Sequence, residues 1–150
     1  MTSAIPAEYS AYISALGLGL LIGIVRERQR DSQQKIAAGM RTHALAALAG
    51  AVAWQLGLPV FAIALAAIAL LAFGSYRLNP ATSPGLTGEV ALVLTTLLGC
   101  LAQPEPGLAA ALAVLVALLL QSRAALHRFS RELISEAEVR DGLLLLAAVV

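Results

Sequence analysis

Charged residues are scarce in this 150-residue chain, where Asp, Glu, Lys and Arg together make up 13% of the positions. Soluble domains carry roughly 25% charged residues. Hydrophobic residues, in contrast, make up 59% of the chain. So few charges cannot readily cover a water-exposed surface, and the composition therefore predicts an integral membrane protein.

Cysteine is almost absent, and the usual catalytic motifs are missing. Cys100 is the only cysteine, which excludes an intrachain disulfide and a multi-cysteine metal site. The sequence has no Ser-His-Asp arrangement to argue for and no Gly-rich phosphate loop after a strand. We therefore expect neither an enzyme nor a bound cofactor, and whether a metal binds stays open.

Basic residues are absent from the first ten positions, Met1 to Ser10. A cleavable signal peptide begins with a positively charged segment. We therefore expect the first apolar segment to be retained as a membrane helix.

Five apolar segments predict an all-α, polytopic fold with five transmembrane helices. Several of these segments are nearer 15 than 20 residues, so their polar flanks would sit in the lipid headgroup layer. The segments are Tyr9–Val25, His43–Leu56, Pro59–Tyr76, Leu86–Ala102 and Leu108–Gln121.

The positions of the basic residues predict the orientation of these helices. All ten Lys and Arg residues lie in three stretches, at residues 26–41, at Arg77 and at residues 123–140. The N-terminus and the turns at residues 57–59 and 103–107 carry none. Because positive charge is enriched on the cytoplasmic side, we expect the N-terminus outside and the three basic stretches in the cytoplasm.

The chain divides into two predicted parts. Residues 1–121 form the membrane domain, and residues 122–150 form a cytoplasmic segment. In the second part, an amphipathic helix is expected on the membrane surface over residues 121–134. A new helix is then expected to start near Ser135 and become apolar, either as the beginning of a sixth crossing or as an end that only dips into the membrane.

Polar residues at the cytoplasmic ends of the helices form a candidate ion or partner site. Thr42 is a candidate N-cap, and His43 is a candidate metal ligand or titrating group, or is simply hydrogen-bonded. Glu89 is either a first-turn carboxylate that the helix dipole stabilises or that pairs with Arg26 or Arg41, or it forms a cation or proton site with Thr95 and Thr96 on the same helix. The whole cluster is Arg26, Glu27, Arg41, Thr42, His43 and Glu89.

Small residues predict close helix packing. Ala15, Gly19 and Gly23 are spaced four apart, which lets two membrane helices approach closely. We favour packing within the chain over dimerisation and include Gly50 among the packing residues. Residues 41–77 and 86–123 each read as one hairpin, which is faintly typical of a parallel repeat. Any two membrane hairpins look alike at this level, and we favour that explanation over a true repeat.

Two short motifs resemble the MgtC/SapB family of bacterial inner-membrane proteins. They are Gly23-Ile-Val-Arg-Glu-Arg28 and Ala38-Gly-Met-Arg-Thr-His43, with Gly50 following in a Gly/Ala-rich helix. Val25 stands where many members have a Glu, so no role for that carboxylate is carried over. The C-terminal part looks like longer relatives that carry a second membrane domain.

The resemblance implies a multi-pass inner-membrane protein of magnesium homeostasis. It also implies membrane partners, of which the F-type ATP synthase is the best-known example. Our first hypothesis is a non-enzymatic protein that acts through such a partner, with membrane lipids and a homo-oligomer as further partners and no nucleic acid. The alternative is an ion transporter or channel module with a polar path near Glu27, Arg41, Thr42 and Glu89.

Overall fold

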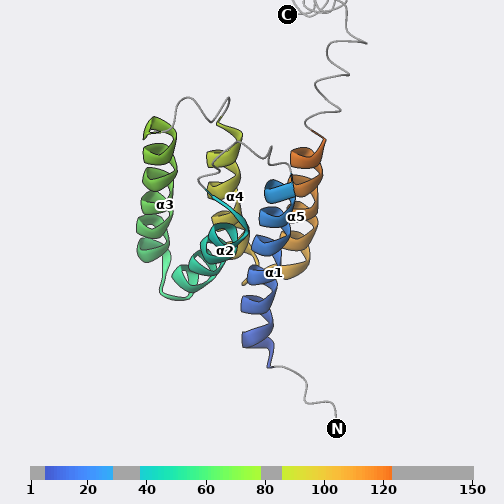
Figure 1. Cartoon of the computed structure of the whole chain (residues 1–150). Coiled ribbons are helices and arrows are strands. Elements are labelled where there is room, and N and C mark those ends of the chain that lie inside the picture. The colour runs from blue at the N-terminus through green and yellow to red at the C-terminus, as the bar shows by residue number, and fades with distance from the viewer. Residues whose placement is uncertain (1–5, 29–37, 79–85, 123–150) are drawn as a thin grey trace, which may run out of the picture. The chain divides into compact units, whose positions relative to one another are not determined.

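The computed structural model describes residues 6–28, 38–78 and 86–122, and these residues form five helices with no strand among them (Figure 1). Each helix covers one of the five predicted apolar segments, so the helical fold class is confirmed. The expected amphipathic helix and sixth crossing fall almost entirely outside the described residues, and the boundary at residue 122 stays a prediction. The helices are α1 (Ala7–Arg28), α2 (Met40–Gln55), α3 (Leu58–Leu78), α4 (Thr87–Leu101) and α5 (Pro106–Gln121).

Two of these helices have the length and hydropathy to cross a bilayer. They are the segment Tyr9–Arg28 of α1 and the whole of α3, with mean hydropathies of 1.5 and 2.3. The other three have 16, 15 and 16 residues. At about 1.5 Å per residue they are shorter than a hydrocarbon core of about 30 Å. Two candidate spans are thus shown among the described residues.

Successive helices run in opposite directions, so the helix ends fall into two groups (Figure 1). The end of α1, the start of α2, the end of α3 and the start of α4 lie at one end. The described arginines are all there, namely Arg26, Arg28, Arg41 and Arg77. At the opposite end, Gly57 turns α2 into α3 with a φ of 104°, a left-handed conformation that favours glycine.

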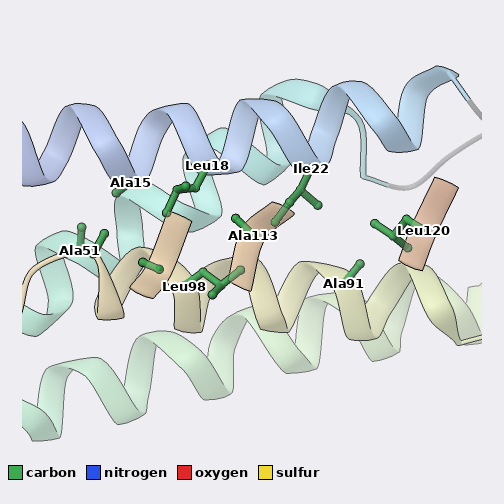
Figure 2. Close-up of a cluster of buried hydrophobic side chains, with 10 residues drawn as sticks. Ala15, Leu18, Ile22, Ala51, Ala91, Leu98, Ala113 and Leu120 are labelled. Atoms are coloured by element: carbon green, nitrogen blue, oxygen red, sulfur yellow. The ribbon is translucent and has the colours of Figure 1, made fainter. Parts of the chain in front are cut away.

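The core lies where α1, α4 and α5 meet, and it is built from small residues and a few leucine and isoleucine side chains. Figure 2 shows Leu18 and Ile22 of α1 directed toward Leu98 and Ala91 of α4, with Ala113 of α5 among them. Small side chains here let the helix backbones come close, which is how helices associate in a lipid environment.

Helices α2 and α4 cross with their backbones in contact. A Cβ atom on Gly50 would collide with the Thr96 carbonyl oxygen, and one on Gly99 would collide with the Ala47 carbonyl oxygen. Gly50 and Gly99 are separated by the same number of residues as Ala47 and Thr96. The two contacts therefore correspond to one another, and the crossing is two-fold in pattern. This separation differs from the one that aligns residues 41–77 with residues 86–123, so the repeat stays a prediction.

The outward surface of α3 is strongly apolar. Ile63, Leu70 and Leu71 are 71%, 70% and 73% exposed. Soluble monomers rarely expose apolar patches of this kind over a long helix. This surface fits contact with lipid tails.

Candidate polar site at the basic end of the helices

Glu27 caps helix α2 from the end of helix α1. The N-cap residue of α2 is Gly39, which has no side chain to cap the helix. Glu27 Oε2 accepts a hydrogen bond of 3.3 Å from the backbone N–H of Met40. A carboxylate at this position satisfies one of the free amides and complements the positive end of the helix dipole.

The expected role of Thr42 as N-cap is therefore wrong. The helix begins at Met40, and the Thr42 amide donates to the Gly39 carbonyl oxygen at 3.1 Å. Thr42 thus lies inside the first turn with its side chain exposed. The cap is supplied by tertiary structure, because Gly39 has no side chain to provide one.

Arg26 reaches across to the first turn of helix α4. Its guanidinium lies directly against Gly88, where a Cβ atom would collide with Nη2. Arg26 and Glu27 are neighbours on α1, and between them they contact the starts of α4 and α2. Two consecutive charged residues therefore tie three helices together at this end.

His43 is fully buried one turn into α2. Its Nδ1 lies 2.9 Å from the Thr95 hydroxyl oxygen on α4, and that hydroxyl donates a hydrogen bond of 2.7 Å to the Ala91 carbonyl oxygen. The other ring nitrogen, Nε2, is buried and has no hydrogen-bond partner among the described residues. The guanidinium of Arg26 is within electrostatic reach of the imidazole.

Glu89 is half-buried in the first turn of α4. Its Oε2 is buried and has no hydrogen-bond partner among the described residues. The Thr95 and Thr96 hydroxyls, expected to continue a cation site from Glu89, both donate to backbone carbonyls of their own helix. They therefore offer a cation only their remaining lone pairs.

The predicted cluster thus separates into two groups. Arg26, His43 and Glu89 are buried or half-buried between helices, whereas Glu27, Arg41 and Thr42 lie on the exposed rim. No group of three or more His, Cys, Asp or Glu side chains suited to a metal occurs in the described part of the chain. The rim group is placed for contact with another molecule, and the buried group is placed between helices.

The predicted packing residues lie at helix interfaces within the chain. Ala15 is buried in the core, and the buried Gly19 and Gly23 lie against the backbone of α2, beside Ala44 and Met40. Gly50 lies at the crossing with α4. Because α2 covers this small-residue face of α1, the face is not available to a second copy of the chain.

Three residues at these interfaces escaped the sequence reasoning. Gly88 makes room for Arg26, Gly99 completes the crossing of α2 and α4, and Gln103 accepts a 3.0 Å hydrogen bond from Gln55 at the opposite end. Gly99 corresponds to Gly50 through the crossing of α2 and α4, which the alignment of residues 41–77 with residues 86–123 did not predict. The roles of Gly88 and Gln103 depend on contacts with distant helices, which no local sequence pattern predicts.

A comparison with known families identifies the family of this chain. A model of the MgtC family matches residues 13–129, which include all five helices from the second turn of α1 onward. The chain belongs to the MgtC family. Membership makes it a membrane protein linked to ion homeostasis, in agreement with the apolar surface of α3. Comparisons with curated proteins and with solved structures give no match.

Proposed function

We propose that this MgtC-family chain is a non-enzymatic protein of magnesium homeostasis that acts by contact with a membrane partner. The F-type ATP synthase is the partner that the family suggests. The site of contact is the exposed basic rim, which adds the exposed Arg28 and Arg77 to Glu27, Arg41 and Thr42. Positive side chains at a membrane surface attract anionic lipid headgroups and acidic segments of partner proteins.

The observation that carries this proposal is the crossing of α2 and α4. Just beyond the His43–Thr95 pair, the two backbones touch through Gly50 and Gly99. Such direct contact leaves no space between these helices for an ion with its ligands. The polar groups at the basic end are thus closed off on this side, which favours contact at the rim over conduction.

The membrane arrangement belongs to the same proposal. We propose that all five helices cross the bacterial inner membrane, with the N-terminus outside and the basic rim in the cytoplasm. The shorter α2, α4 and α5 would be accommodated by local thinning of the bilayer and by polar flanks in the headgroup layer. The described arginines all lie at one end of the helices, which supports this orientation.

The partner is tested by ATP-driven proton pumping in inverted inner-membrane vesicles that contain or lack the protein. We expect the protein to lower the pumping rate, and Arg41→Ala to relieve most of this inhibition by removing a positive charge from the rim. Leu58→Ala is the matched control, since Leu58 is 68% exposed at the opposite end. Equal pumping with and without the protein would overturn the proposal.

The second candidate function is ion transport. The observation in its favour is the buried Oε2 of Glu89, which has no hydrogen-bond partner. A buried carboxylate oxygen of this kind is a ligand that Mg²⁺ accepts. The path would include Glu27, Arg41, Thr42 and Glu89, and it would have to run along another interface than the α2–α4 crossing.

A further inference from the structure

The hydrogen bonds around His43 determine which ring nitrogen carries the proton. A threonine hydroxyl has one hydrogen to donate, and at Thr95 that hydrogen goes to the Ala91 carbonyl oxygen at 2.7 Å. The Thr95 oxygen can then only accept from the imidazole, 2.9 Å away. In a neutral ring His43 therefore carries its hydrogen on Nδ1, and Nε2 presents a bare lone pair.

The charge around this lone pair disfavours a cation. Helix α1 contributes Arg26, whose guanidinium acts on the ring, and Glu27, which is engaged with the Met40 amide. A second positive charge beside a guanidinium is costly where the surroundings exclude water. A buried acceptor left without any donor also costs about 1–3 kcal/mol, so a neutral donor fits Nε2 better than a metal ion does.

The polar pair is not demanded by the packing of the two helices. At the same separation along the chain, His43 of α2 corresponds to Leu92 of α4, and Ala46 of α2 corresponds to Thr95 of α4. Ala46 and Leu92 lie together in a buried apolar cluster, so the same crossing is built once with a polar pair and once with an apolar pair. The pair of Ala46 and Leu92 thus shows that leucine and alanine can pack at this crossing of α2 and α4.

We propose that Thr95 is a positioning residue that holds His43 as the Nδ1–H tautomer, so that Nε2 accepts a hydrogen bond from a neutral O–H or N–H donor. None of the described residues supplies this donor. This assignment goes beyond the proposed function, because it holds whether the protein acts by contact or by conduction.

The test is nitrogen NMR of the full chain in detergent micelles, with ¹⁵N-labelled histidine. The chain has two histidines, so His127→Gln leaves His43 as the only labelled ring. We expect a protonated Nδ1 and an Nε2 resonance shifted to the position of a hydrogen-bonded acceptor. Thr95→Val should lose the single tautomer, and Thr95→Ser should keep it, since serine restores the hydroxyl.

Several results would overturn the proposal. A ring protonated on Nε2, an Nε2 resonance of a free nitrogen, or a tautomer unchanged in Thr95→Val would each do so. Zn²⁺ is the probe for a metal, because imidazole binds it well. We expect added Zn²⁺ to leave the Nε2 resonance in place, and a shift would assign this nitrogen to a metal instead.

A double variant separates this role from folding. His43→Leu combined with Thr95→Ala copies the apolar pair of the other half of the crossing. We expect this variant to unfold at the same temperature as the parent chain or above it, because the costly buried polar groups are gone. Failure of the double variant to fold would make the polar pair a requirement of the structure and contradict the assignment.

Discussion

At the scale of single residues, Glu27 has the clearest electrostatic role, because its carboxylate replaces the N-cap side chain that Gly39 lacks. The hydrogen bond to the Met40 amide joins α1 to the start of α2. The contact lies at the exposed rim, where solvent weakens charge interactions, so its contribution is that of an ordinary helix cap.

Replacing Glu27 should therefore destabilise the fold modestly. We expect Glu27→Ala to lower the free energy of unfolding by about 1 kcal/mol, the usual cost of losing an N-cap. Glu27→Gln keeps an acceptor and loses only the attraction to the helix dipole, about 0.5 kcal/mol. Unfolding by SDS in mixed micelles measures both. Equal stability of all three chains would show that the 3.3 Å contact has no energetic role.

The residues of the polar site were predictable from the sequence only as a group. Charged and capping residues beside an apolar run mark the end of a membrane helix, which was enough to place Arg26, His43 and Glu89 at one level. The division into a buried and an exposed group was not predictable, because it depends on where α2 starts. Because α2 starts at Met40, Thr42 lies within its first turn with an exposed side chain, and Glu27 supplies the cap.

At the scale of helices, the crossing of α2 and α4 depends on glycine. The backbone contacts at Gly50 and Gly99 leave no volume for a methyl group. Here the sequence predicted the helix bounds well, since long apolar runs end at polar residues and prolines. It did not predict which helices cross, because contact between two runs of small residues depends on distant parts of the chain.

Adding a methyl group at the crossing should destabilise the protein. We expect Gly50→Ala and Gly99→Ala each to cost about 2 kcal/mol, as overpacking in a dense core does. Gly17→Ala is the matched control, because a Cβ atom there meets nothing within 4 Å. It should leave stability unchanged or raise it by up to about 1 kcal/mol, since alanine favours the helix. Thermal unfolding in detergent compares the three.

Equal stability of the glycine variants would contradict the backbone contact at the crossing. If Gly99→Ala were as stable as Gly17→Ala, the two helix backbones could not be in contact at the crossing. The result would also contradict the closed interface between α2 and α4, which is the observation that supports action by contact.

At the scale of the whole molecule, the proposed five crossings can be tested by cysteine labelling. In a Cys100→Ser background, Gly107→Cys places a thiol at an exposed position with open space, and Arg28→Cys places one on the basic rim. A membrane-impermeant maleimide added to intact cells should label position 107 and not position 28. Permeabilised cells, in which both should react, provide the control.

Labelling of position 28 from outside would reverse the proposed orientation. Labelling of both positions from outside would place them on the same side of the membrane, and α5 would then begin on the side where α1 ends. Either result would remove the cytoplasmic location of the basic rim on which the partner contact depends.

The central claim is that the protein acts by contact at its basic rim and does not conduct ions. The most direct measurement is Mg²⁺ flux into liposomes that hold the full-length chain in one orientation, with a known magnesium channel as positive control. We predict a flux no higher than that of empty liposomes, for the parent chain and for Glu89→Gln alike. A clear flux in the parent chain that Glu89→Gln abolishes would contradict the account and establish the transporter instead.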